Sequence, residues 1–244
     1  MSANPISGAG YLLQGMRLIN RPGLRRFVLI PLLINIGVFA AAIYLGYTRF
    51  EGFIVWMEGE IPPWLHWLEW VLWPLFVLTL VLLVFYTFSL VANLLAAPFN
   101  GLLAEKVELQ LTGKPLDEGS GIKRILVTLV PALIDEVRKV LYALLWAIPF
   151  LILFFIPVVN VTAPVLWFLY SAWMLNLQYM DYPMGNHELK FRQMRARLTT
   201  RRTLGLSFGA ATLGLTMLPV INFIAMPSAV AGATAMWVRE FRDR

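Results

Sequence analysis

The 244-residue chain has no cysteine and only two histidines, His66 and His187. Disulfides, thiolate metal sites and cysteine nucleophiles are therefore excluded, and two imidazoles leave little for a histidine-based metal or catalytic centre. The sequence also contains no phosphate-binding glycine loop, no H-E-x-x-H and no G-x-S-x-G motif. We therefore expect neither an enzyme nor a protein with a metal or another cofactor.

Charge is scarce as well. Only 14% of the residues are charged, whereas 59% are hydrophobic. A typical soluble domain is about one-quarter charged and at most about half apolar, and a fold of this size cannot bury so much apolar surface from water. The composition thus excludes an ordinary soluble enzyme, a disordered tail and a nucleic-acid-binding module. It predicts an all-α integral membrane protein with a single membrane domain over 1–244.

Four long stretches contain no charged residue and no histidine: 27–48, 70–104, 140–180 and 203–238. A membrane-spanning helix needs about 20 apolar residues, so the first stretch predicts one transmembrane helix over 27–48. The second predicts a longer transmembrane helix over 70–112 that extends into the cytoplasm. Its helical pattern continues to Leu111, after which Gly113 and Pro115 end it.

The last two stretches each carry a proline and an asparagine at their midpoint, in Ile156-Pro157-Val158-Val159-Asn160 and Leu218-Pro219-Val220-Ile221-Asn222. Proline ends a helix and asparagine suits the turn that follows. We therefore predict helical hairpins over 140–180 and 203–238. Their arms of about 25 Å are shorter than a hydrocarbon core of about 30 Å, which favours partial penetration. Four short spans joined by tight turns are the alternative.

Lysine and arginine are distributed unevenly between the connecting segments. Segment 49–69 has one, whereas 1–26 has four, 105–139 and 181–202 have six each and 239–244 has three. Basic segments stay in the cytoplasm, so both termini are predicted to be cytoplasmic and 49–69 periplasmic. An aromatic belt surrounds the periplasmic segment and comprises Trp56, Trp64, Trp67, Trp70 and Trp73.

Three further segments have the pattern of amphipathic helices at the cytoplasmic interface. They are an N-terminal interfacial arm over 1–26, loosened by its glycines, a helix over 120–139 and a basic helix over 187–202. The basic helix is expected to lie against anionic headgroups.

Among the amide side chains of the charge-free stretches, four asparagines come one from each stretch: Asn35, Asn93, Asn160 and Asn222. An amide in hydrocarbon is costly unless it finds a partner. These side chains therefore either form hydrogen bonds between helices or line a pore of neutral dipoles. Neutral donors stabilise an anion without holding it too tightly to leave.

The run Arg21-Pro22-Gly23-Leu24-Arg25-Arg26 directly precedes the first predicted span. Because Pro22 and Gly23 interrupt the preceding segment, a helix should begin near Leu24. A helix N-terminus offers free N–H groups and the positive end of the helix dipole. Together with Arg25 and Arg26 it predicts a site for a tetrahedral oxyanion. The alternative is that these arginines only mark the cytoplasmic side.

Three further sequence features are less specific. Asp135-Glu136 beside Arg138-Lys139 predicts a surface ion-pair cluster, and Gly205-x-x-x-Gly209 is compatible with a close helix contact. We interpret His187-Glu188 as a solvated surface dyad.

Three features occur together along the chain: Gly23-Leu24-Arg25-Arg26, then Ala97-Pro98-Phe99-Asn100 with Leu103-Ala104-Glu105-Lys106-Val107-Glu108, and the two Pro–Asn tips. In this ordered set the chain resembles the CysZ family, the bacterial inner-membrane sulfate permeases that supply sulfate for cysteine biosynthesis. The resemblance implies sulfate uptake described as proton-dependent, two long membrane helices, two hairpins that penetrate part-way, and a homo-oligomer. It places sulfate at Gly23, Leu24, Arg25 and Arg26.

Proton coupling usually requires an acid or histidine inside the membrane, and the charge-free stretches contain neither. A channel-like route would need no acid or histidine inside the membrane. A proton-coupled route could instead use charged residues at the rim of the membrane domain. The candidate rim residues are Glu105, Glu108, Asp135 and Arg138. The competing hypothesis is a non-transporting membrane scaffold or assembly partner, whose amphipathic helices serve protein contacts.

Overall fold

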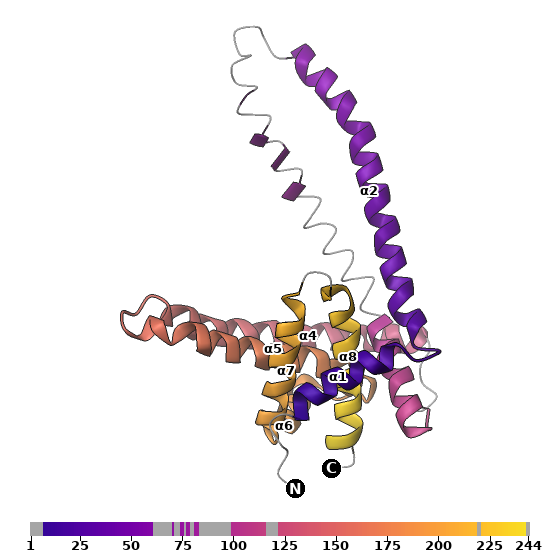
Figure 1. The fold of residues 1–244 in the computed structure, drawn as a ribbon, viewed down its shortest axis with the longest axis vertical. Coiled ribbons are helices and arrows are strands. Elements are labelled where there is room, and N and C mark those ends of the chain that lie inside the picture. Colours follow the sequence, from indigo (N-terminus) through magenta and orange to yellow (C-terminus); the bar gives the residue numbers. More distant parts are fainter. Residues whose placement is uncertain are drawn as a thin grey trace. The chain divides into compact units, whose positions relative to one another are not determined.

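The computed structural model describes residues 7–60, 70, 74–75, 77–78, 81–82, 99–115, 122–218 and 221–242. Within these residues every regular element is a helix, as predicted (Figure 1). The elements are α1 (Ser7–Ile19), α2 (Arg25–Glu60), a helical segment over 99–112, α4 (Ile122–Leu153), the 3-10 turn η2 (Val159–Val161), α5 (Ala163–Asn186), α6 (Phe191–Thr199), α7 (Arg202–Thr216) and α8 (Asn222–Glu240). The chain forms two compact units, the first comprising Met1–Val28 with Asn100–Arg244 and the second Leu29–Phe99.

Helix α2 is longer than the predicted transmembrane helix over 27–48, because it continues to Glu60. Charged residues after Thr48 end the apolar stretch, but they do not end the helix. Its first part, Arg25–Leu45, is apolar and long enough to cross a membrane, and it is the one candidate span in the described part of the chain. Most side chains along it are exposed, as lipid-facing side chains would be.

The helix predicted over 70–112 is described only in parts. Residues 70, 74–75, 77–78, 81–82 and 99–112 are helical. The segment over 99–112 ends where Gly113 takes a positive φ of 68°, at the glycine that the sequence marks as the end of the helix.

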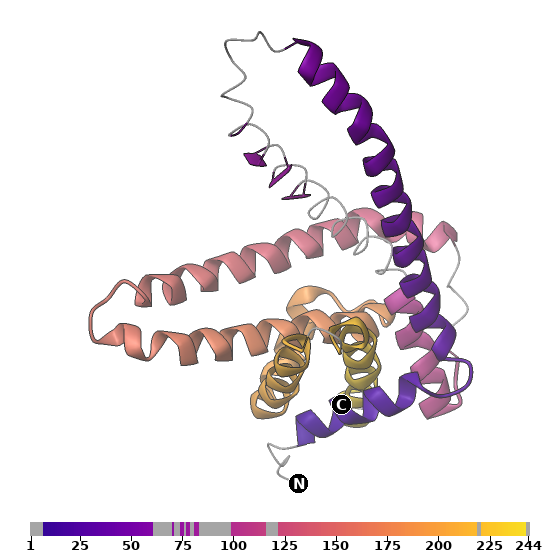
Figure 2. The same cartoon turned by 45° about the horizontal axis from the view of Figure 1, so that its top comes forward.

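Helices α4 and α5 lie side by side as an antiparallel pair (Figure 2). The chain reverses over 154–162, around the first Pro–Asn midpoint, and Pro164 stands in the first turn of α5. The Tyr170 hydroxyl donates to the Ala143 carbonyl at 2.8 Å, and Trp173 Nε1 donates to the Tyr142 hydroxyl at 3.3 Å. These bonds hold the two helices together near the middle of the pair.

The predicted boundary between an amphipathic helix over 120–139 and a hairpin over 140–180 is wrong, because α4 crosses it without a break. The end of a charged run marks a change of surroundings and leaves the backbone hydrogen bonding unchanged. Likewise, the basic helix predicted over 187–202 is shorter in the structure, where α6 covers Phe191–Thr199.

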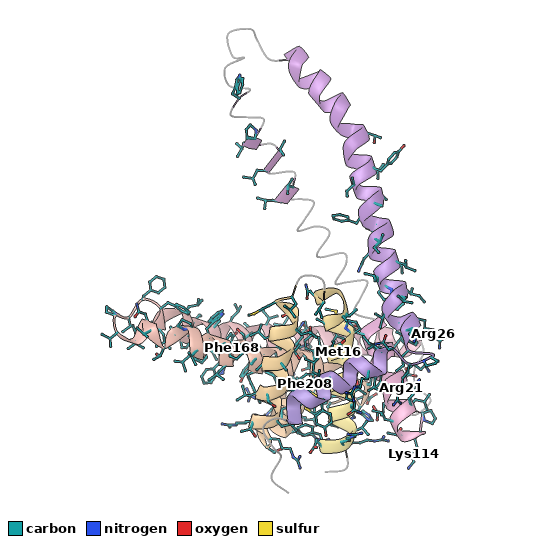
Figure 3. The ribbon with its side chains drawn as sticks, in the orientation of Figure 1. Met16, Arg21, Arg26, Lys114, Phe168 and Phe208 are labelled. Carbon is teal, nitrogen blue, oxygen red and sulfur yellow. The ribbon has the colours of Figure 1, made fainter. Side chains whose placement is uncertain are left out.

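The outer surface of the α4–α5 pair is apolar. Leu145 is 68% exposed on α4, and Phe155 and Val158 are each 86% exposed at the turn. Figure 3 shows Phe168 on this projecting pair and Phe208 inside the packed helices. An apolar surface of this extent on a monomer marks contact with a membrane or a partner.

Helix α8 forms the centre of the first unit and packs against α1, α5 and α7 (Figure 1). Every residue from Pro227 to Trp237 is buried. The second predicted hairpin, over 203–238, therefore has one arm covered by protein. Its chain reverses between the end of α7 at Thr216 and the start of α8 at Asn222.

Within the N-terminal arm predicted over 1–26, α1 is one continuous helix that packs against α8 and α7. A Cβ on Gly15 of α1 would overlap the Ser228 carbonyl of α8, and a Cβ on Gly232 would lie 2.6 Å from the Tyr11 carbonyl. Of the glycines that sequence reasoning took as loosening α1, Gly15 thus lets it approach α8 backbone to backbone, and Gly8 meets the Leu204 carbonyl of α7 instead. The Tyr11 hydroxyl also donates to Glu240 Oε1 at 2.8 Å.

The Gly205-x-x-x-Gly209 motif does form a close helix contact, between α7 and α5. A Cβ on Gly209 would overlap the Ala172 carbonyl, and a Cβ on Gly205 would lie 2.6 Å from the Asn176 amide nitrogen. Backbone atoms cannot move aside as a flexible side chain can, so only glycine fits at Gly209.

We predict that Gly209→Ala lowers the free energy of unfolding by about 2–3 kcal/mol, because the methyl group forces α5 and α7 apart. Gly214→Ala is the matched control in the same helix. No atom lies within 4 Å of its Cβ position, so the substitution should raise stability by up to about 1 kcal/mol. Thermal unfolding of both variants in detergent distinguishes the two effects, and equal melting temperatures would contradict the packing described.

Candidate functional site

A tight turn joins α1 to α2 and presents the predicted oxyanion motif. The Arg21 amide donates to the Leu18 carbonyl at 2.9 Å, and the Leu24 amide donates to the Arg21 carbonyl at 3.2 Å. Gly23 has a φ of 86°, a left-handed conformation that glycine adopts without a steric penalty. The turn delivers the chain into α2 at Arg25, one residue after the predicted start.

Leu24 is fully buried, with 0% of its surface exposed. It therefore anchors the turn to the core and offers no side-chain group to a ligand. Arg25 and Arg26 are exposed. Of the four residues predicted to hold sulfate, the structure thus places two guanidinium groups and the Gly23 backbone at the surface of one turn.

The two guanidinium groups are oriented by different contacts. Arg25 Nε donates to the Asn20 carbonyl at 2.6 Å, which folds the side chain back over the turn. The Arg26 guanidinium lies 5.0 Å from the centre of the Phe27 ring. Figure 3 shows Arg21 and Arg26 at the junction of α1 and α2, with Lys114 on the same side in that view.

Gln110, in the helical segment 99–112, also contacts the turn. Its Nε2 donates to the Pro22 carbonyl at 3.3 Å. Sequence reasoning did not single out this residue, because no local pattern links it to a turn 88 positions away.

The geometry of the turn suits an oxyanion. The first N–H groups of a helix have no partner within it, and they point along the axis with the positive end of the helix dipole. In α2 the Phe27 amide already donates to the Leu24 carbonyl at 3.0 Å, so a tetrahedral anion would accept from the amides before it and from guanidinium donors. Within the described residues, no three His, Asp or Glu side chains are grouped as metal ligands.

Two of the predicted pore-lining asparagines, Asn160 and Asn222, lie on separate tips of the first unit. Asn160 is exposed in η2 at the α4–α5 turn, and Asn222 is exposed at the start of α8. Figures 1 and 2 both show the α4–α5 turn projecting away from α7 and α8. Asn35 is partly exposed in α2, in the second unit, and Asn93 lies outside the described residues.

Three of the four predicted rim residues form ion pairs with near neighbours. Glu105 lies 3.2 Å from Lys106, and Asp135 lies 2.9 Å from Arg138. Beside the second pair, Lys139 Nζ lies 2.6 Å from both Glu136 and Asp181 and ties α4 to α5. Burial acts to lower the pKa of Lys139, but the two carboxylates outweigh it, so the pKa lies above its usual value.

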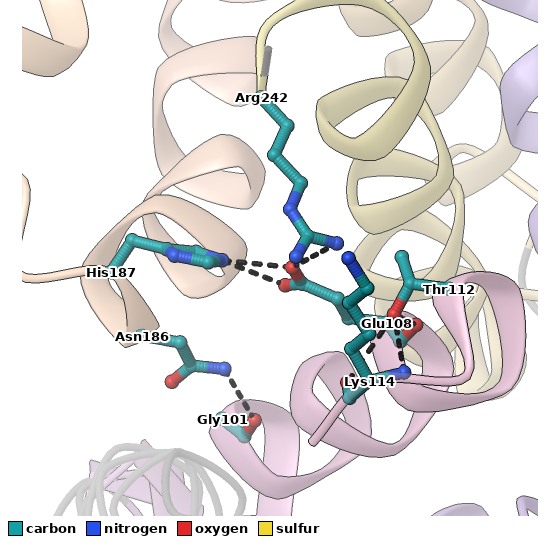
Figure 4. A network of polar contacts seen from close by, with 7 residues as sticks. All are labelled: Gly101, Glu108, Thr112, Lys114, Asn186, His187 and Arg242. Atoms are coloured by element: carbon teal, nitrogen blue, oxygen red, sulfur yellow. Dashed lines mark hydrogen bonds and ion pairs between the residues drawn. The ribbon is translucent and has the colours of Figure 1, made fainter. Parts of the chain in front are cut away.

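Glu108, the fourth rim residue, is buried, with 1% of its side chain exposed (Figure 4). His187 Nε2 lies 2.9 and 3.0 Å from its two carboxylate oxygens, and Arg242 Nη1 lies 3.3 Å from Oε1. The His187 ring also packs on Trp237, with 5.2 Å between ring centres. Glu108 is therefore an internal anchor for the end of α5 and the end of α8.

The interpretation of His187-Glu188 as a solvated dyad is wrong for His187. Its partner is Glu108, 79 positions earlier in the chain. A histidine and a carboxylate so far apart in sequence carry no local signal, whereas Glu188 is next to His187 in the sequence and suggested a pair.

The family model described as Sulfate transporter CysZ/Etoposide-induced protein 2.4 matches residues 11–227. The chain belongs to this family. The match covers the α1–α2 turn, the segment over 99–112, the α4–α5 pair and the start of α8. Membership suggests a broad role in membrane sulfate transport, in agreement with the resemblance that the motifs indicate.

We predict that Glu108 and His187 are energetically coupled by about 1–3 kcal/mol, because removing either partner leaves the other half-satisfied in a buried site. A double-mutant cycle with Glu108→Gln and His187→Ala, followed by thermal unfolding, measures this coupling. Strictly additive effects of the two substitutions would show that the contact is incidental.

Proposed function

We propose that the chain takes up sulfate across the bacterial inner membrane and binds the anion at the start of α2. Family membership supports sulfate transport in general. The observation that supports the site is the Gly23 turn, whose positive φ leads directly into a helix that opens with two exposed arginines. The supply of sulfur for cysteine biosynthesis follows from the same proposal, which includes no enzymatic step.

The chemistry of sulfate fits this turn. Sulfate is a tetrahedral dianion with four acceptor oxygens, so several donors can bind it without abstracting or giving a proton. Backbone N–H groups and guanidinium groups are donors of this kind. Because Arg25 and Arg26 are exposed to solvent, water screens the attraction. Binding then stays weak enough for release, as transport requires.

The exposed apolar surfaces support a membrane location. The part of α4 beyond Lys139 has 14 residues, from Val140 to Leu153, and reaches about 21 Å at 1.5 Å per residue. A hydrocarbon core is about 30 Å thick. An α4–α5 hairpin whose charged base at Lys139 and Asp181 stays at the surface would therefore penetrate part-way.

A route lined by all four asparagines would draw on more than one protomer, because Asn160 and Asn222 lie on separate tips of one chain. The proposal therefore includes a homo-oligomer. Proton dependence would involve ionisable groups outside the charge-free stretches, such as Glu105 or Asp135 at the rim.

We predict that Arg25→Ala and Arg26→Ala each weaken sulfate binding about ten-fold or more, since a hydrogen bond between charged groups contributes about 1.5–3 kcal/mol. Calorimetry on the purified protein measures the affinity, and sulfate flux into proteoliposomes should fall in parallel. Arg192→Ala, an exposed arginine on α6, is the control for net charge. Native sulfate affinity in both arginine variants would show that the anion does not bind at this turn. Absence of sulfate flux through the native protein would favour the scaffold hypothesis.

We also predict that a reporter fused at Lys190 lies in the cytoplasm, because Lys190 is one of six basic residues in 181–202. Reporters with opposite activity in cytoplasm and periplasm test this in living cells. A fusion within 49–69 is the internal reference and should report the periplasm. A periplasmic Lys190 would contradict the proposed orientation.

A further inference from the structure

The Pro22–Gly23 peptide group lies between the candidate anion site and Gln110. Gln110 Nε2 donates to the Pro22 carbonyl at 3.3 Å, and the Cβ position of Gly23 lies 3.8 Å from the same nitrogen. The Pro22 carbonyl and the Gly23 N–H belong to one planar peptide group and point in opposite directions. A donor that fixes the carbonyl oxygen therefore also fixes the direction of the Gly23 N–H.

The helical segment that carries Gln110 is held along its length. The Asn186 amide donates to the Gly101 carbonyl at 3.1 Å, and the Asn100 amide donates to the Tyr182 hydroxyl at 3.3 Å. Near the other end, Glu108 is held by His187 and Arg242 (Figure 4). The segment is thus fixed to α5 and to the end of α8.

Glu108 and Gln110 project from opposite faces of this segment. Two residues along an α-helix correspond to a rotation of about 200°. One face contacts His187 and Arg242, and the other contacts the Pro22 turn. The segment therefore bridges the packed helices and the candidate site.

We infer that Gln110 is a positioning residue for the anion site. Its amide binds the Pro22 carbonyl and aims the Gly23 N–H and the start of α2 toward the oxyanion. The same bond opposes a flip of the peptide group that would turn the carbonyl oxygen toward the anion. The inference rests on the proposed function, because it names a residue that acts on the proposed sulfate site. The segment over 99–112 transmits the position of the packed helices to this turn.

Two substitutions of Gln110 distinguish a positioning role at the anion site from a contribution to protein stability alone. Gln110→Met keeps the length of the side chain and removes the donor, and we expect sulfate affinity to fall about three-fold. Gln110→Glu replaces the donor with an acceptor that repels both the Pro22 carbonyl and the anion. We expect sulfate affinity to fall about ten-fold at neutral pH, which corresponds to about 1.4 kcal/mol. Because Gln110 is exposed, neither variant should change the melting temperature appreciably.

The pH dependence of sulfate affinity in Gln110→Glu is a further test. A purely structural role of Gln110 would not make this affinity, relative to the native protein, depend on pH. An ordinary glutamic acid has a pKa of about 4.3. Below that pH the protonated carboxyl group can donate to the Pro22 carbonyl and carries no charge. Sulfate affinity of the variant, relative to the native protein at the same pH, should therefore recover in acid.

Gln193→Glu is the matched control. It makes the same change of charge on α6, and its carboxylate can still accept from the Lys190 amide, as Gln193 does at 3.0 Å. Its sulfate affinity should follow the native protein at every pH. All four proteins are titrated with sodium sulfate by calorimetry, as full-length protein in detergent.

The outcomes separate the inference from the function on which it rests. Sulfate binding by the native protein, with unchanged affinity in both Gln110 variants, would overturn the positioning role and leave the proposed function intact. A loss of sulfate affinity that comes with a lower melting temperature and no recovery in acid would show that Gln110 is only a structural contact. That result would also overturn the inference. Absence of sulfate binding by the native protein would overturn both.

Discussion

Backbone-to-backbone contact at glycine is the constraint on which the first unit depends. Gly15 and Gly232 bring α1 against α8, and Gly209 brings α7 against α5. Close packing of small residues brings the backbones together and gains dispersion energy over a long interface. As a result α8 is surrounded by protein, although its composition alone resembles that of a membrane-inserted arm.

This packing also locates the candidate site. Since α1 is fixed on α8, its C-terminal end has a defined position, and the turn from Asn20 to Leu24 starts there. Leu24 anchors the turn in the core, Gly23 supplies the left-handed backbone, and Arg25 folds back onto the Asn20 carbonyl. The charged groups themselves remain in solvent. Their attraction for an anion is therefore moderate, and in the proposed site the N–H groups at the start of α2 would add directed donors.

Several features could be predicted from the sequence because they depend on neighbouring residues. Charge-free stretches identified helices, the first Pro–Asn pentad identified the reversal between α4 and α5, and Pro22-Gly23 identified the start of α2 to within one residue. Other features depend on partners distant in sequence and had no local signal. The burial of α1 requires Ser228 and Gly232, and the anchoring of Glu108 requires His187 and Arg242. The continuity of α4 across Lys139 was missed because charge marks the edge of an apolar surface and leaves the helix itself intact.

We propose that the backbone N–H groups of Gly23 and of the start of α2 bind an oxyanion. The most direct test is to follow the amide resonances of Gly23 and Arg25 by NMR in selectively ¹⁵N-labelled native protein during a sulfate titration. The account predicts saturable shifts of these two amides with sulfate, and much smaller, non-saturating shifts with an equal ionic strength of chloride. Resonances that stay in place with sulfate, or that move equally with both salts, would contradict it.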